Sequence, residues 1–145
     1  MIQVQVEYEL NKVKELDTNW INMICNNIFN DNNHIDANIT IILSDDDRLY
    51  KLKKEYFNKD LLTDVISFNL EENGEPIEGE VYISFDRIKE NAIKFNQSLE
   101  EELKRVIVHG CLHLLGFDDQ TIKDKKQMTS LENHYLKYPT ISELN

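Results

Sequence analysis

The chain has 145 residues, a formal net charge of −11 at pH 7 and two cysteines. The length predicts a single domain over residues 1–145, the cysteine count excludes a disulfide framework, and no apolar run approaches the roughly 18 residues of a membrane span. The excess of acidic side chains argues against sequence-independent binding of bare nucleic acid, which usually requires a basic surface.

Strands and helices alternate in the first half of the chain. Alternating apolar and polar residues predict a half-buried strand at residues 2–10, and apolar residues at helical spacing predict an amphipathic helix around residues 15–30. A β-branched run predicts a second strand over residues 38–44. Ser44 and Asp47 then resemble a capping box, which marks the start of a second helix.

Two strands and three helices are expected in the second half. Residues 63–70 and 79–85 are typical of strands, and sequential strands are usually neighbours in one sheet. The residues expected to cap the three helices that follow are Asp86, Ser98 and Thr121. This order of elements predicts an α+β fold, in which helices pack on a small mixed four-stranded sheet and the C-terminal half is helical.

The middle one of these three helices carries the sequence VHGCLHLLGFDDQ, which has the residue types of a metal site. His109 and His113 are four residues apart, so both imidazoles leave the same face of the helix and can bind one ion. Gly116 allows a positive φ and a reversal of the chain, after which Asp118 or Asp119 could provide a third ligand. Three protein ligands leave a fourth tetrahedral position for water, as in catalytic zinc sites.

Structural roles are the alternatives for these residues. Histidines on a mostly apolar helix are often packed with local hydrogen bonds, and aspartates such as Asp118 and Asp119 often cap the following helix. Thr121 can provide that cap instead, which leaves an aspartate free. Cys111 points about 200° away from the first histidine and is expected in the core. The protease motif HExxH has Glu where this chain has Gly110, so a zinc peptidase of that type is not expected.

Four segments of the chain resemble motifs of the YbeY family, bacterial rRNA maturation factors described as zinc-dependent endoribonucleases. The segment HGCLHLLGFDD at 109–119 is similar to the family motif H-G-x-L-H-L-x-G-(Y/F)-D-H. TDVISF at 63–68 and GEVYIS at 79–84 resemble its strands (S/T)-(D/N)-V-(L/I)-S-F and G-D-I-x-I-S. The segment YFNKD at 56–60 stands where the family has Y-R-G-K-D. The motifs occur in the order and spacing of the family.

The resemblance implies one Zn²⁺ ion per chain, bound by His109, His113 and Asp119. The family usually has histidine at the third of these positions; aspartate is also a zinc ligand, and it makes the site more negative. The arginine of the family's Y-R-G-K-D, which would be expected to meet phosphate, is Phe57 here. Lys59 lies nearby in sequence and could replace its charge.

The resemblance also implies a reaction and partners. The family cleaves single-stranded RNA in the 3′-end maturation of small-subunit rRNA and acts in late ribosome quality control. Asp118 is then expected to act as a base or to support a metal ligand, and Lys59 to assist catalysis. The expected partners are rRNA and the small ribosomal subunit, with ribosomal proteins or an assembly GTPase, but neither DNA nor a membrane. The first ten residues lack a secretion signal, which predicts a cytoplasmic protein.

An acidic chain can hold RNA only if its positive charges are segregated toward the metal. The candidates for such a surface are Lys51, Lys53, Lys54, Lys59, Lys104, Arg105, Lys123, Lys125 and Lys126. Three other functions remain open: a non-catalytic ribosome-assembly factor with a structural zinc, a metallohydrolase of another substrate, and a metal-free interaction module.

Overall fold

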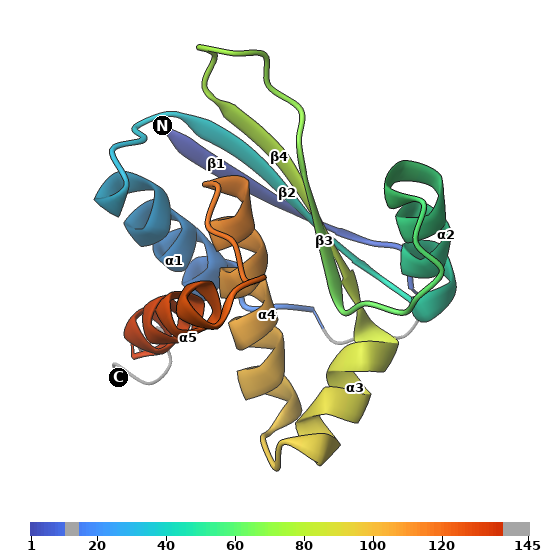
Figure 1. The fold of residues 1–145 in the computed structure, drawn as a ribbon. Coiled ribbons are helices and arrows are strands. Elements are labelled where there is room, and N and C mark those ends of the chain that lie inside the picture. The colour runs from blue at the N-terminus through green and yellow to red at the C-terminus, as the bar shows by residue number, and fades with distance from the viewer. Residues whose placement is uncertain (11–14, 138–145) are drawn as a thin grey trace.

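The computed structural model describes residues 1–10 and 15–137, and a four-stranded sheet lies at its centre (Figure 1). In spatial order the strands are β1 (Ile2–Tyr8), β2 (Ala37–Ser44), β4 (Ile77–Ser84) and β3 (Val65–Asn69). β1, β2 and β4 run parallel, whereas β3 is antiparallel to β4 and forms one edge of the sheet. The expected mixed sheet is therefore confirmed, including the pairing of the last two strands.

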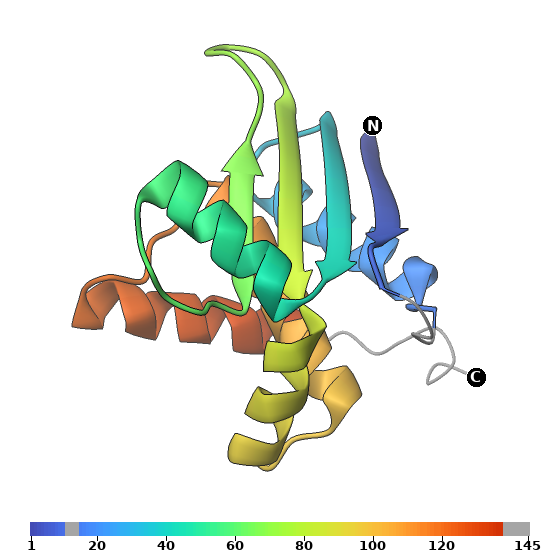
Figure 2. The same cartoon turned by 90° about the vertical axis from the view of Figure 1, so that its right-hand side faces the viewer.

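Helices cover both faces of this sheet. Their bounds are α1 (Thr18–Asp31), α2 (Asp46–Phe57), α3 (Phe85–Lys94), α4 (Leu99–Leu114) and α5 (Ile122–Leu136). α1, α4 and α5 lie on one face and α2 lies on the other (Figures 1 and 2). The α+β class and the order of elements agree with the sequence-based prediction. No helix in the described ranges is long and apolar enough to cross a membrane.

α2 does not begin where the sequence predicted, and the expected capping box of Ser44 and Asp47 is wrong. Ser44 is still the last residue of β2 and pairs with Ser84 of β4, so its backbone belongs to the sheet. The N-cap is Asp45, whose side chain accepts a hydrogen bond from a backbone N–H in the first turn of α2. Because β2 continues through Ser44, the cap of α2 falls on the next residue, Asp45.

The start of α3 also differs, because Asp86 does not cap it. The cap is Ser84, the last residue of β4. The Asp86 carboxylate instead accepts a hydrogen bond from the backbone N–H of Asp46, 3.0 Å away, and so completes the N-terminus of α2. Ser98 and Thr121 cap α4 and α5 as expected.

Two apolar clusters hold the layers together. The larger lies between the sheet and α1, α4 and α5, and the smaller consists of Leu49, Leu52 and Ile66 beneath α2. Cys111 is fully buried in the larger cluster, as predicted, with its sulfur 3.8 Å from that of Cys25. The hydrogen bond between these thiols and their burial raise the pKa of Cys25.

α4 approaches the sheet most closely at Gly110. A Cβ atom there would lie 2.5 Å from Cγ1 of Val81 and 3.1 Å from Cγ2 of Val65. The Ser67 hydroxyl donates a hydrogen bond of 2.8 Å to the carbonyl oxygen of Gly110. The position that HExxH peptidases fill with Glu therefore has no room for a side chain.

Replacement of Gly110 by glutamate is expected to prevent folding or to lower the free energy of unfolding by about 4 kcal/mol or more. The substitution clashes with the valines of the sheet and buries an unpaired charge. Leu99→Glu is the matched control, because Leu99 is 41% exposed in the first turn of the same helix, where an acidic side chain is favoured. Denaturant unfolding followed by circular dichroism measures both, and wild-type stability of Gly110→Glu would contradict the close packing.

Candidate metal centre

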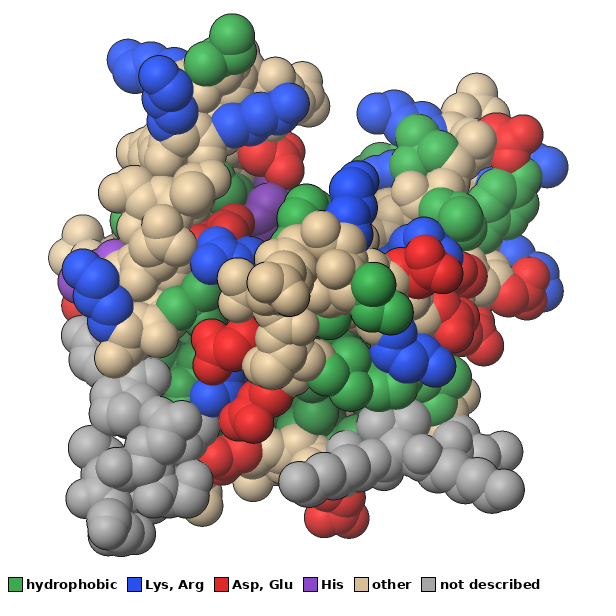
Figure 3. All heavy atoms as spheres, turned by 90° about the horizontal axis from the view of Figure 1, so that it is seen from below, with side chains coloured by type: hydrophobic (Ala, Val, Ile, Leu, Met, Phe, Trp, Pro, Cys, Tyr) green, Lys and Arg blue, Asp and Glu red, His purple; other side chains and the backbone are tan. Residues whose placement is uncertain are grey.

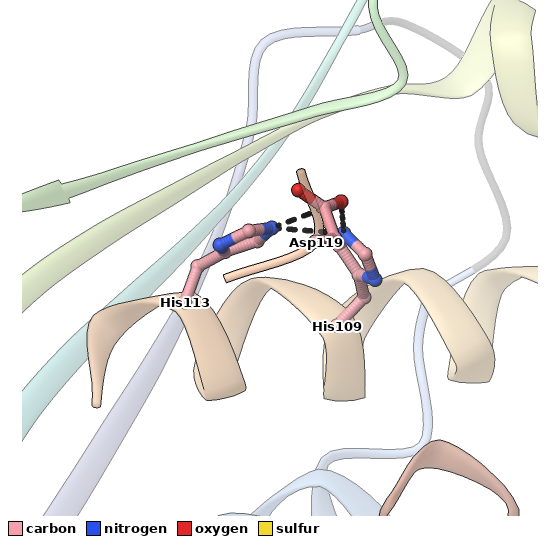
Figure 4. Close-up of side chains that lie close together, drawn as sticks. All are labelled: His109, His113 and Asp119. Atoms are coloured by element: carbon pink, nitrogen blue, oxygen red, sulfur yellow. Dashed lines mark hydrogen bonds and ion pairs between the residues drawn. The ribbon is translucent and has the colours of Figure 1, made fainter. Parts of the chain in front are cut away.

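Three side chains from α4 and the loop after it point toward one another (Figure 4). His109 and His113 lie one turn apart on α4, and their Nε2 atoms are 2.9 Å apart. The Oδ2 atom of Asp119 lies 3.2 Å from Nε2 of His109 and 3.5 Å from Nε2 of His113. The structure thus brings together the three residues that were expected to bind a metal.

The separations of these donor atoms fit a tetrahedral metal site. Donors that lie about 2.0–2.1 Å from one Zn²⁺ ion in tetrahedral geometry are about 3.3–3.4 Å from one another. The three observed separations, 2.9, 3.2 and 3.5 Å, surround this value. Two imidazole nitrogens and one carboxylate oxygen also form a donor set that Zn²⁺ accepts. The residues present therefore fit one divalent ion held by three protein ligands.

The loop after α4 determines which aspartate reaches the histidines. Gly116 has a φ of 96°, and its N–H donates to the carbonyl oxygen of His113 at 3.0 Å, so the chain turns back over the helix. The exposed Asp118 accepts a hydrogen bond of 2.8 Å from the backbone N–H of Asp119. Asp118 therefore shapes the loop, and Asp119 is the aspartate that faces the histidines.

A residue that the sequence analysis missed, Glu132 of α5, supports His109 from behind. Its Oε2 atom lies 2.6 Å from Nδ1 of His109, and its Oε1 atom lies 2.9 Å from Nη1 of Arg105. An ionised carboxylate only accepts hydrogen bonds, so Nδ1 carries the imidazole proton and Nε2 is left with a lone pair for a metal. The Glu132 side chain is 8% exposed, which strengthens both interactions.

A charged residue on an apolar helix face is the signal that could have revealed this role. Glu132 follows Met128 by four residues and precedes Tyr135 by three, and all three are buried. An acidic side chain at such a position needs a buried partner. The partner, His109, lies 23 residues earlier in the chain, and no sequence pattern points to it.

The two histidines differ in their affinity for protons. Burial lowers the pKa of His109, but the hydrogen bond and charge of Glu132, together with the charge of Asp119, outweigh it and raise the pKa above its usual value. Burial and the neighbouring His109 lower the pKa of His113. A proton on Nε2 would compete with a metal ion, and His109 holds such a proton more tightly than His113 does.

A cavity of about 350 Å³ adjoins His109 and Glu132. Its polar lining also includes Asp64, which precedes β3, and Glu102 of α4. Asp64 accepts a hydrogen bond of 3.3 Å from the side chain of Asn91. Burial raises the pKa of Asp64 and of Glu102. This side of the centre is therefore acidic and holds protons more tightly than exposed carboxylates do.

Basic side chains lie on two sides of a hollow that has a histidine at its base, over the start of α5 and over α2 (Figure 3). Burial and the charge of Lys59 lower the pKa of Lys53, while the charge of Asp119 raises it, so both charges lie within electrostatic reach of Lys53. Lys104, in contrast, is 8% exposed and lies over the ring of Trp20, 5.1 Å from its centroid. Of the candidates for the basic surface, Lys104 is therefore excluded.

Known proteins resemble this chain over most of its length. The family model of endoribonuclease YbeY matches residues 3–139. The endoribonuclease YbeY of Flavobacterium psychrophilum is 39% identical over 134 residues, which cover 92% of this chain and 94% of the relative. The endoribonuclease YbeY of Azobacteroides pseudotrichonymphae is 40% identical over 124 residues, which cover 86% of each.

A solved structure is also similar. The solution structure of TM1509 from Thermotoga maritima matches with a TM-score of 0.63 and 29% sequence identity. The match covers 93% of this chain and 87% of that one.

Replacement of Glu132 by glutamine is expected to weaken Zn²⁺ binding by about 10- to 100-fold, because the neutral amide holds the Nδ1 proton of His109 less strongly. Competition with a chromophoric chelator measures the affinity. Asp118→Asn is the matched control: its Oδ1 can still accept from the N–H of Asp119, so its affinity should equal that of the wild type. A folded Glu132→Gln protein with unchanged affinity would show that Glu132 does not support the ligand.

Proposed function

The chain belongs to the YbeY endoribonuclease family, and we propose that it is a zinc-dependent endoribonuclease that cleaves single-stranded RNA. The proposed substrate is the 3′ region of small-subunit rRNA, and the proposed setting is late ribosome maturation and quality control in the cytoplasm. The proposed partners are the small ribosomal subunit, ribosomal proteins and an assembly GTPase.

The observation that carries this proposal is the triangle of His109, His113 and Asp119 near basic side chains. Three donors with tetrahedral separations leave one coordination position for a substrate oxygen or water. When bound, a Zn²⁺ ion supplies Lewis acidity for phosphodiester cleavage. Lys53, whose ionisation is affected by the charge of Asp119, supplies a positive charge for the phosphate of the substrate.

The other residues of the centre position groups and hold protons. Glu132 keeps the proton of His109 on Nδ1, so the ligand nitrogen stays directed at the metal. Asp64 lies in the adjoining cavity, where burial raises its pKa, and it is a candidate for holding or exchanging a proton. Asp118 and Lys59 remain candidates for a catalytic role, and both are exposed.

Two alternatives are separated from this proposal by specific observations. A zinc peptidase that uses a Glu beside its first histidine is disfavoured, because Gly110 has no room for a side chain. A ribosome-assembly factor with a purely structural zinc requires the metal for folding. The core, however, is built from apolar residues of the sheet and helices and does not include the three ligands. This favours a site that folds without its metal.

Replacement of His113 by alanine is expected to leave the protein folded and to reduce cleavage of single-stranded RNA by about 100-fold or more, because a metal contributes several kcal/mol to catalysis. Gel electrophoresis of labelled RNA measures cleavage, and circular dichroism verifies the fold. His34→Ala is the matched control, because His34 lies outside the cluster of donors, and it should retain activity.

Three results would decide against the proposal or refine it. Wild-type cleavage by folded His113→Ala protein would contradict it, and unfolding of that variant would support the structural-zinc alternative. The ends of the products identify the nucleophile: a 2′,3′-cyclic phosphate indicates attack by the ribose hydroxyl, whereas its absence from fresh products indicates attack by water.

A further inference from the structure

Aromatic side chains are exposed at the end of α2. Tyr56 and Phe57 occupy the last turn of the helix and are 62% and 42% exposed. Both rings contact Phe68 of β3, which in turn contacts Tyr82 of β4. We call these four residues the aromatic surface. Adjoining exposed rings of this kind are characteristic of binding surfaces.

The ring of Tyr56 is largely accessible, and Phe68 covers only part of it. Its centroid lies 5.3 Å from that of Phe68, and the two planes meet at 69°, an edge-to-face contact that covers at most one face of the Tyr56 ring. Phe57 lies nearly parallel to Phe68, with 28° between the planes and 5.8 Å between the centroids. Phe68 therefore packs against the rings of both Tyr56 and Phe57. This contact holds the Tyr56 ring in place while most of it stays exposed.

A positive charge adjoins this surface on Lys53. The Nζ atom of Lys53 is 4.7 Å from the centroid of the Phe57 ring. Lys53 is also close enough to Asp119 and Lys59 for each to affect its ionisation. On the side of the hollow where α2 lies, hydrophobic side chains are next to lysine and arginine side chains (Figure 3). The aromatic surface therefore adjoins a cation that lies within electrostatic reach of Asp119.

We propose that Tyr56 stacks on a base of single-stranded RNA and that Lys53 contacts a neighbouring phosphate, so that the aromatic surface holds the strand beside the metal centre. The inference rests on the proposed function, since it places the substrate of that same site. Aromatic rings with adjacent basic side chains are the general means of binding single strands, because every base has a flat face. Stacking depends little on net charge, so in a chain with a charge of −11 it adds to what a local basic surface contributes to RNA binding.

A tryptophan introduced in place of Tyr56 reports the contact directly. In zinc-loaded Tyr56→Trp protein, emission should be quenched by a single-stranded uridine-rich RNA of about 12 nucleotides and not by the same RNA in a duplex, whose bases are already stacked. The native Trp20 is 1% exposed, so the change reports position 56. Ile35→Trp is the control, because Ile35 is 76% exposed in the connection between α1 and β2 and should not respond.

Affinity measurements with the same RNA test the energetic role of the ring. Tyr56→Ala should weaken binding by about 5- to 150-fold, whereas Tyr56→Phe, which keeps the ring, should bind like the wild type. Lys53→Gln should reduce the slope of log K against log salt by about 0.7, the value for one phosphate of a single strand. Electrophoresis of the RNA after each titration verifies that it is intact.

The outcomes separate this inference from the proposed function. Unquenched emission from the Tyr56→Trp variant and unchanged affinity of Tyr56→Ala, in a protein that binds and cleaves RNA, would overturn the stacking role and leave the nuclease proposal intact. A wild-type protein that neither binds nor cleaves single-stranded RNA would overturn both. In that case the aromatic surface would serve contact with another protein.

Discussion

The close packing of α4 on the sheet at Gly110 is the constraint on which the metal centre depends. With no side chain at this position, the helix backbone approaches Val81 and is tied to β3 by the Ser67 hydroxyl. One face of α4 thereby becomes core, and the two histidines are left half-buried on the face next to it. A helix fixed in this way presents the two histidines without the help of a metal, which suits the proposed catalytic site.

Glu132 connects the core to the chemistry of the site. A buried carboxylate is stable only when it is paired, and Glu132 meets both Arg105 and His109. The same contacts join α5 to α4 and fix the tautomer of His109. Positive and negative charges are thus divided within the molecule: three carboxylates and one arginine line the cavity beside His109, and basic side chains flank the hollow on the sides of α5 and α2. A net charge of −11 is therefore compatible with a local basic surface.

The parts of the site that the sequence predicted are those that local patterns determine. The spacing of His109 and His113 follows from the helical repeat, and the choice of Asp119 over Asp118 came from the family motif. Glu132 was missed because its role depends on two helices whose contact no local pattern encodes. The caps of α2 and α3 were misplaced for a similar reason, because both depend on segments far apart in the sequence: Ser44 pairs with Ser84 across the sheet, and the Asp86 carboxylate accepts from the N–H of Asp46 at the start of α2. Lys104 was misjudged because helix position alone does not say which neighbour covers a side chain.

Metal content tests the central claim most directly. Untagged protein, purified without chelator, is analysed for Zn, Mn, Ni and Fe per chain, together with the His113→Ala variant. The account predicts close to one zinc ion per wild-type chain and its loss from the folded variant. Substoichiometric metal that is unchanged in His113→Ala would contradict the metal centre and remove the proposed chemistry with it.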